Sequence, residues 1–442
     1  MQRRWILRGA RRVVAALLAL GTACTSDGAG PPRGNGSSPI ATPDPGEGGV
    51  IRFGILGEAP TLDPYSPLAS HLTFALVRPL YRSLYRWDED GNPVPDLVES
   101  IEVNGRRAVV QLVATRWSNG RAIDTRDVRA TWRNASPESG FKAVSRLRAI
   151  DSNTLELVGS IRNWPRALAR LTFVLPRGRP RPGVWSGPFG LTRRTRGLEY
   201  VYEPNARWDG RPVLAARIHV FVVERLEILI DLLEEGRLDA AAPPLSVNLD
   251  QRLHEVGLES ESALGWEIVY LDFSGSALTE EQRFGLYRLI DRRRLERGLV
   301  RDQGRLARSL RSGPGRVRAP RLPGGAVPTG AILQLAVPVG DELLEFVQRV
   351  LQRDLARSGI RLEMVSIDAA TFYGAWRRDD PIDLALRRRV GGPGMPSSER
   401  PPDALPLWQT ESVLAWRSGV HGLIVNPTVE GPLWNASEWW IE

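Results

Sequence analysis

Residues 116–128 read Arg-Trp-Ser-Asn-Gly-Arg-Ala-Ile-Asp-Thr-Arg-Asp-Val. The second half of this stretch predicts the start of a helix, because Asp124 can cap the helix and Asp127 falls in its first turn, where a negative charge is favourable. Residues 108–114 before it and 154–158 after it have the composition of strands and are bounded by turn-forming residues. A helix between two strands is therefore expected around the quoted stretch.

The same alternation of strands and helices recurs along the chain. Strands are expected at residues 49–56, 218–223, 332–337 and 360–367. Apolar residues at helical spacing predict helices over 224–235 and 341–357, and Thr279 with Gln282 has the form of a capping box at a third helix. Residues 309–330 are rich in Pro, Gly and Arg and are expected to form a loop. Strands alternating with helices indicate an α/β fold.

Length and composition indicate a globular protein of more than one lobe. The chain has 442 residues, which is longer than the roughly 250–300 at which a single core stops growing. Hydrophobic residues make up 42% and charged residues 25%. The net charge is +8, but five arginines lie in residues 1–23, which contain no acid, so removal of that segment leaves +3. That residual charge argues against nucleic acid as a partner.

The amino-terminal residues have the pattern of a secretory signal. A basic stretch is followed by the short apolar run 13–20 and then by Gly-Thr-Ala before Cys24. The predicted signal peptide is 1–23. Residues 24–48, rich in Gly, Pro, Ser and Asp, form a predicted flexible tether, because they have too few large apolar residues to offset the entropy of ordering.

Cys24 is the only cysteine, so it has no partner for an internal disulfide. Leu-Gly-Thr-Ala-Cys at residues 20–24 resembles the bacterial lipobox, although Gly21 stands where that motif usually has Leu. The resemblance implies lipidation of Cys24 and anchoring of the protein to a membrane. The alternative is an incidental cysteine after an ordinary signal peptide.

The sequence offers little for catalysis or for metal binding. Lys142, the only lysine, follows Phe141, so a phosphate-binding loop is absent. His71, His219, His254 and His421 are isolated from one another, and no Gly-x-Ser-x-Gly motif is present. We therefore expect that the protein has no enzymatic activity and binds neither a metal ion nor a cofactor.

Several motifs, in a fixed order, resemble the extracellular solute-binding proteins of family 5, the oligopeptide, dipeptide and nickel binders of ABC importers. The quoted stretch is similar to the Trp-Ser-Asp/Asn-Gly block of that family and to its helix start ending in Asp-Val. Further blocks in the family's order are Thr-Leu-Asp-Pro at 61–64, residues 80–84 and 88–97, Ser-Gly-Pro-Phe at 186–189, Asn-Ala-Arg-Trp-Asp-Gly at 205–210, 233–239, 289–292, 359–363 and Pro-Leu-Trp at 406–408.

The resemblance implies an α/β, two-lobed periplasmic-binding-protein-like fold of class II type, with an extra subdomain in the first lobe and a hinge-linked ligand cleft. The implied domains are a first lobe at 49–268, a second lobe at 269–412 and a return to the first lobe at 413–442. The chain departs from the family after residues 382–386, where Arg387, Arg388 and Arg389 stand in place of acidic ligand contacts. The second lobe is therefore expected to be shortened, which weakens the case for a peptide ligand.

Five residues are candidates for ligand binding, each with a simpler alternative. Glu58 precedes the opening loop and either faces the cleft or is a solvated loop acid. Tyr85, Trp185 and Tyr270 either border a ligand or belong to the core. Arg387 either attracts an anionic ligand or belongs to an exposed basic loop. Trp117 is expected to be a packing residue.

The function that these features favour is capture of a peptide or other small solute for an ABC permease complex, by a protein on the outer face of the cell membrane or in the periplasm. The alternative is an interaction or sensor lipoprotein on the same fold that does not feed a transporter.

Overall fold

The computed structural model describes residues 43–246, 248–273, 276–299, 305–306, 330–339, 341–367, 372, 382–390 and 403–442. The predicted signal peptide, Cys24, most of the predicted tether and nearly all of the predicted loop 309–330 lie outside these ranges, so lipidation stays a prediction. Within the described ranges, no helix combines the length and the apolar character that crossing a bilayer requires.

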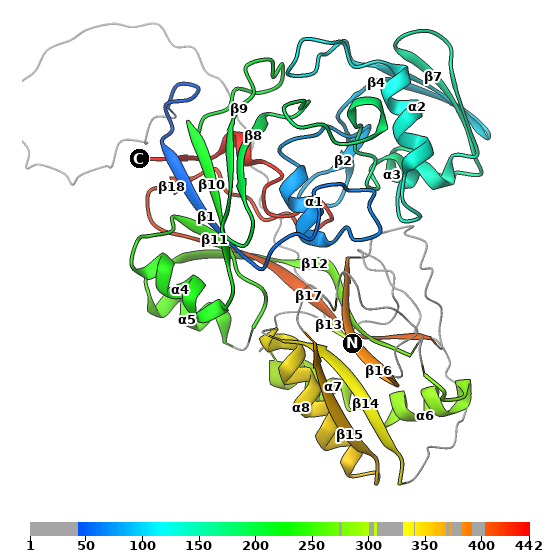
Figure 1. Cartoon of the computed structure of the whole chain (residues 1–442), viewed down its shortest axis with the longest axis vertical. Coiled ribbons are helices and arrows are strands. Elements are labelled where there is room, and N and C mark those ends of the chain that lie inside the picture. Colours follow the sequence, from blue (N-terminus) through cyan, green and yellow to red (C-terminus); the bar gives the residue numbers. More distant parts are fainter. Residues whose placement is uncertain are drawn as a thin grey trace, which may run out of the picture. The chain divides into compact units, whose positions relative to one another are not determined.

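A single mixed sheet of 11 strands runs through the described part of the chain (Figure 1). Its strand order is β15-β14-β16-β12-β17-β11-β1-β10-β9-β8, with β13 paired to β17. The strands are β1 (Val50–Leu56), β8 (Phe189–Thr195), β9 (Glu199–Pro204), β10 (Arg217–Val223), β11 (Ala240–Ala242), β12 (Glu259–Asp272), β13 (Arg305–Leu306), β14 (Ile332–Pro338), β15 (Arg361–Ile367), β16 (Leu384–Val390) and β17 (Ala404–Trp416).

The sheet serves two lobes because β12 and β17 are long enough to take part in both (Figure 1). The first half of β12 pairs with the last residues of β17, and its register shifts between Leu264 and Ile268. Beyond that irregularity, β12 lies between β17 and β16 and contributes Val269 and Leu271 to a separate hydrophobic core. The two-lobed α/β fold expected from the sequence is thus present.

The first lobe carries the predicted extra subdomain, a four-stranded antiparallel sheet in the order β4-β5-β7-β6. Its strands are β4 (Val98–Asn104), β5 (Arg107–Leu112), β6 (Arg146–Ala149) and β7 (Thr154–Val158). The other elements of this lobe are α1 (His71–Val77), β2 (Tyr85–Trp87), β3 (Pro93–Pro95), α2 (Thr125–Asn134), η1 (Gly140–Ala143), α3 (Trp164–Leu168), η2 (Pro176–Gly178), α4 (Leu226–Glu234), α5 (Leu249–Glu255), β18 (Val420–His421), η4 (Ala436–Glu438) and β19 (Trp440–Ile441).

The second lobe contains the predicted β-α-β unit of β14, α8 (Glu342–Ala356) and β15, with α6 (Glu280–Leu289) and α7 (Arg292–Leu299). The two strands of this unit are parallel. The predicted capping box is confirmed, because the Thr279 hydroxyl accepts from the backbone N–H of Gln282 and the Gln282 side chain accepts from that of Thr279. Asp341 caps α8 in the same way, by accepting from Leu344 N at 3.1 Å.

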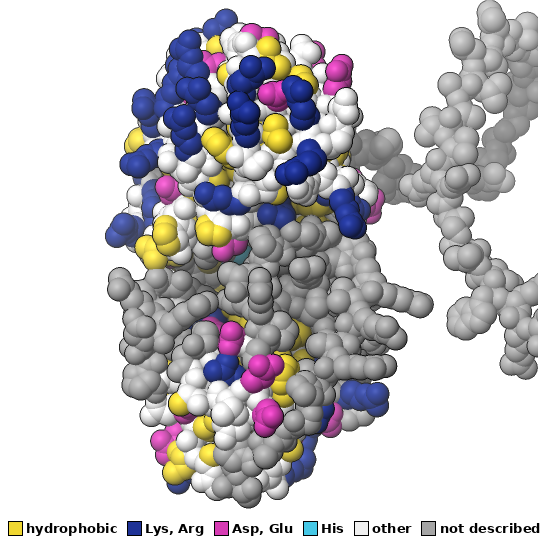
Figure 2. All heavy atoms as spheres, turned by 90° about the vertical axis from the view of Figure 1, so that its right-hand side faces the viewer, with side chains coloured by type: hydrophobic (Ala, Val, Ile, Leu, Met, Phe, Trp, Pro, Cys, Tyr) yellow, Lys and Arg dark blue, Asp and Glu magenta, His cyan; other side chains and the backbone are white. Residues whose placement is uncertain are grey.

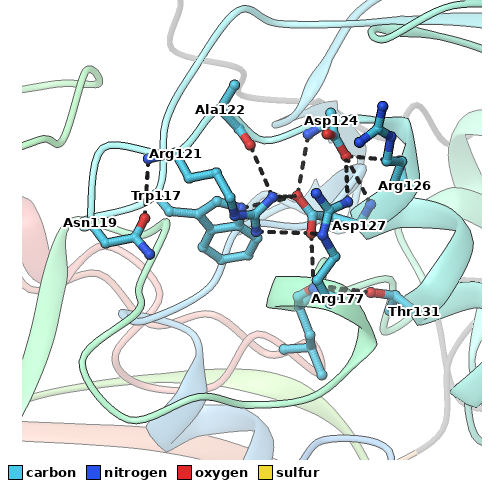
Figure 3. Close-up of polar contacts among 10 residues, drawn as sticks. Trp117, Asn119, Arg121, Ala122, Asp124, Arg126, Asp127, Thr131 and Arg177 are labelled. Carbon is cyan, nitrogen blue, oxygen red and sulfur yellow. Dashed lines mark hydrogen bonds and ion pairs between the residues drawn. The ribbon is translucent and has the colours of Figure 1, made fainter.

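One buried carboxylate, that of Asp127, holds residues 116–128 together (Figure 3). Asp127 is 0% exposed, and its oxygens accept from the indole Nε1 of Trp117 at 3.0 Å and from both terminal nitrogens of Arg121 at 3.0 Å each. The backbone N–H of Arg177 donates to it at 2.9 Å. Asp124 caps α2 as predicted, and Trp117 is confirmed as a packing residue, since it is fully buried.

Candidate functional site

A cavity of about 160 Å³ lies where the first lobe meets β12 and β17, the two strands that pass from one lobe to the other. Its walls come from the end of β1, from α1, from the segment after β11, from β12, β16 and β17, and from residues 425–432. Apolar side chains make much of the wall, among them Ile55, Leu72, Leu245, Val413 and Val425. The polar side chains are His71, Glu267, Arg388, Thr410, Glu411, Ser412, Asn426 and Thr428.

Arg388 on β16 is the basic residue at the cavity, and two carboxylates neutralise it. Its Nη1 lies 3.1 Å from Glu267 Oε2, and its Nη2 lies 2.5 Å from Asp341 Oδ1. All three side chains are at least four-fifths buried. Because ion pairs gain strength away from water, this cluster fixes Arg388 against β12 and the start of α8.

Glu267 on β12 is the acid that faces the cavity. Its Oε2 accepts from Arg388 and also from the Thr410 hydroxyl at 3.1 Å. Burial by itself raises the pKa of Glu267, but the positive charge of Arg388, the neighbouring His71 and the hydrogen bond from Thr410 together lower the pKa below its usual value. Glu267 is therefore ionised at neutral pH.

His71 is the first residue of α1 and lines the cavity opposite these charges. Its side chain keeps an exposed surface, yet the surrounding protein desolvates it and lowers its pKa below the usual value. Glu267 and Asp341 oppose that effect, whereas Arg388 reinforces it. His71 is therefore mainly neutral at pH 7, and a neutral imidazole offers one donor and one acceptor nitrogen.

The wall formed by the carboxy-terminal segment is held rigidly. Asn426 Oδ1 accepts from the backbone N–H of Thr428 at 2.9 Å and from its hydroxyl at 2.6 Å. Two residues further on, Glu430 is fully buried, pairs with Arg78 and accepts from Trp87 N at 3.0 Å. Burial raises the pKa of Glu430, against the influence of Arg78 and of that hydrogen bond. These contacts tie the cavity wall to α1 and β2.

The five predicted ligand-binding residues lie elsewhere, since none is among the described residues that line the cavity. Glu58 contacts the β8–β9 hairpin, through Arg194 at 3.1 Å and Gly197 N at 2.9 Å. Tyr85 is buried in β2, and Trp185 is half-buried with its ring centroid 5.7 Å from that of Tyr81.

Tyr270 and Arg387 are opposite each other on β12 and β16. Tyr270 is 3% exposed, and Arg387 forms an ion pair with Asp272 at 2.9 Å and lies over the ring of Phe372. The next arginine along β16, Arg388, is the one at the cavity. Successive residues of a strand point to opposite faces. The sequence singled out this run of arginines, but it predicted neither that the run forms a strand nor which of its residues meets the cavity.

A shallow groove beside α5, open to solvent, is lined by Asp250, His254, Glu259 and Trp416 among others, and the Trp416 indole donates to Glu259 at 3.0 Å. Within the described ranges, no three His, Cys, Asp or Glu residues cluster in a way that holds a metal ion. The groove is too open to enclose a solute.

Arginines are numerous on the surface, as the upper part of Figure 2 shows, but acidic side chains are interspersed among them. On the outer face of the four-stranded sheet, Arg107 and Arg148 both pair with Glu156. Arg193 and Arg217 pair with Glu199 and Glu203 on the other sheet. This pairing reduces the positive potential that a nucleic acid would require.

No protein-family model matches the sequence, and no curated protein matches it. Similar solved structures span nearly the whole fold. The oligopeptide-binding protein AppA of Bacillus subtilis, in complex with a nonapeptide, has a TM-score of 0.74 at 14% identity over 90% of this chain and 100% of that one. NikZ of Campylobacter jejuni, in complex with Ni(L-His), gives 0.72 at 13% over 88% and 99%. The ABC transporter substrate-binding protein CtaP of Listeria monocytogenes gives 0.69 at 14% over 89% and 99%.

Proposed function

From the fold that this chain shares with solute-binding proteins, we propose that it captures a small solute outside the cell and delivers it to an ABC permease. The observation that carries the proposal is the cavity at the meeting of the lobes, where Glu267 from β12 and Arg388 from β16 face His71 from the first lobe. A concave, largely apolar site with a few convergent polar groups is the usual form of a small-molecule site.

The anchor and the domain limits belong to the same proposal. Cleavage before Cys24 and lipidation of its side chain would hold the protein at the outer face of the membrane, with residues 25–48 as a tether. We place the first lobe at 49–268, the second, shortened lobe at 269–412 and the return at 413–442. The irregular register between Leu264 and Ile268 supports a boundary at that point of β12.

The site supports binding rather than catalysis. Among the described residues, no hydroxyl or carboxylate is hydrogen-bonded to His71, so no nucleophile is paired with a base there. Arg388 is engaged by two carboxylates, which suits a fixed wall better than a group that changes partners during a reaction.

The test is thermal unfolding of the 25–442 fragment in the presence of a library of peptides, amines, sugars, metal ions and carboxylates. A solute that binds only the folded protein stabilises it by about 2.7 kcal/mol at a hundredfold excess over its dissociation constant. We expect one chemical class to raise the melting temperature. A well-folded protein that responds to nothing would contradict solute capture and favour the sensor lipoprotein.

A pair of variants locates the binding. Leu72 lines the cavity, and Leu68 lies nearby in sequence, outside the cavity and 42% exposed. Leu72→Trp should fill the cavity and abolish the shift that the solute produces, whereas Leu68→Trp should leave it intact. A shift that survives Leu72→Trp would place the solute elsewhere.

A further inference from the structure

Among the described residues, the basic residue of the cavity, Arg388, is held in ion pairs, whereas one acid of the lining, Glu411, is not. Both terminal nitrogens of the Arg388 guanidinium form ion pairs, Nη1 with Glu267 and Nη2 with Asp341. Glu411, a further acid in the lining, accepts from the Ser262 hydroxyl at 2.8 Å but has no ion-pair partner among the described residues. Among the described residues in the lining or paired with it, the three carboxylates of Glu267, Glu411 and Asp341 outnumber the single guanidinium of Arg388, so their summed charge is negative.

One carboxylate oxygen of Glu267, Oε1, accepts no hydrogen bond from the described residues. The bonds from Arg388 and Thr410 both end on Oε2, and no described residue donates to Oε1. The ring of His71, which shares the cavity, has no hydrogen-bond partner among the described residues either. One acceptor oxygen and one imidazole are thus left for a solute.

The size of the cavity limits the solute. About 160 Å³ is close to the volume of an engineered cavity, about 150 Å³, that takes up benzene. A molecule of roughly this size fills the described cavity, and the nearby apolar side chains of Leu72, Leu245 and Val425 would contact its nonpolar part.

We infer that the solute is a small organic cation, with an ammonium group that donates to Glu267 Oε1 and an aliphatic part that packs against the apolar wall. This inference rests on the proposed function and names the substrate class of that site. A free ammonium supplies the donors that Glu267 lacks and the positive charge that the cavity lacks. An anionic solute would have to displace Glu267 or Asp341 from Arg388, which costs a buried ion pair.

Three probes of nearly equal size distinguish cationic, neutral and anionic solutes: n-butylammonium, n-butanol and n-butyrate. Their dissociation constants for the 25–442 fragment can be measured by titration followed by ligand-observed NMR. We expect n-butylammonium to bind about tenfold or more tightly than n-butanol, because its hydrogen bond to Glu267 is charge-assisted, and n-butyrate to bind least. This comparison requires no variant and therefore does not depend on any substitution's effect on folding.

The variant Glu267→Gln keeps the shape of the side chain and removes its charge. It should bring the dissociation constant of n-butylammonium close to that of n-butanol. The matched control is Glu203→Gln, which makes the same change in a half-buried residue that is paired with Arg217 outside the cavity, and it should leave the preference unchanged.

Equal or tighter binding of n-butanol or n-butyrate would overturn the inference, and so would binding of none of the three or a cation preference that survives Glu267→Gln. In each case, a non-cationic solute from the library that raises the melting temperature leaves solute capture standing. Failure of the entire library is what overturns the proposed function itself.

Discussion

At the scale of single residues, Asp127 shows how the fold uses a buried charge. Its carboxylate accepts five hydrogen bonds, of which two come from the Arg121 guanidinium, one from the indole of Trp117 and one from the backbone N–H of Asp124. The Arg177 backbone N–H, which belongs to η2, supplies the fifth. Asp127 therefore joins the turn before α2, α2 itself and a segment some fifty residues further along the chain.

Asp127→Asn should destabilise the protein by about 2–4 kcal/mol, because an amide cannot accept all five bonds and leaves Arg121 without its buried partner. The partial exposure of Arg121 and Arg177 keeps the estimate below that of a fully buried pair. Urea unfolding measures the change. Asp231→Asn, at an exposed position on α4, is the control and should stay within about 0.5 kcal/mol. A similar loss in both variants would refute a special role for Asp127.

Prediction from sequence succeeded for residues whose partners are local. Asp124 and Thr279 bond to backbone groups two or three residues away, so their roles follow from spacing alone. His71, Glu267 and Arg388 come together only because the fold brings α1, β12 and β16 to one cavity, and nothing near His71 in the sequence marks it. The helix caps could therefore be predicted from the sequence, whereas the cavity residues could not.

At the scale of elements, strand and helix positions were predictable where hydrophobic periodicity and turn residues agree. The expected strand 154–158 is β7 without change, and the expected helix 224–235 is α4, shorter by two residues at its start and one at its end. The expected strand 108–114 ends early as β5, at Leu112, because the next N–H, that of Val113, donates to Leu97 O. Such ends depend on long-range partners.

The capping box of α6 offers a test at this scale. Thr279→Ala removes the acceptor for Gln282 N and should cost about 1 kcal/mol of stability. Thr279→Ser retains the hydroxyl and should cost much less. Thermal unfolding of the two variants provides the measurement, and equal losses would mean that the methyl group, rather than the cap, stabilises this end of α6.

At the scale of the whole molecule, the first lobe is built from both ends of the described chain. Ile441 N donates to Gly48 O at 3.0 Å, and the ring of Trp439 lies 5.1 Å from that of Phe53 on β1. The second lobe is inserted between β12 and β17, whose far ends are joined by the hydrogen bond from Phe273 N to Asp403 O at 2.7 Å. The resemblance implied this path, whereas the continuity of the sheet through both lobes was not foreseen.

This path predicts that the second lobe can be removed without unfolding the first. Ile268 and Gln409 are paired residues on β12 and β17, so an Asn-Gly turn can join them in place of residues 269–408. The shortened protein should unfold cooperatively on heating, followed by circular dichroism. It should bind no solute, because removal of Arg388 opens the cavity wall and releases the side chain of Glu267. Joining Ile268 to Thr410 instead shifts the register by one residue, turns the side chains of β17 to the wrong face and should prevent folding. If the in-register protein also fails to fold, the first lobe depends on the second, and the insertion is not an independent unit.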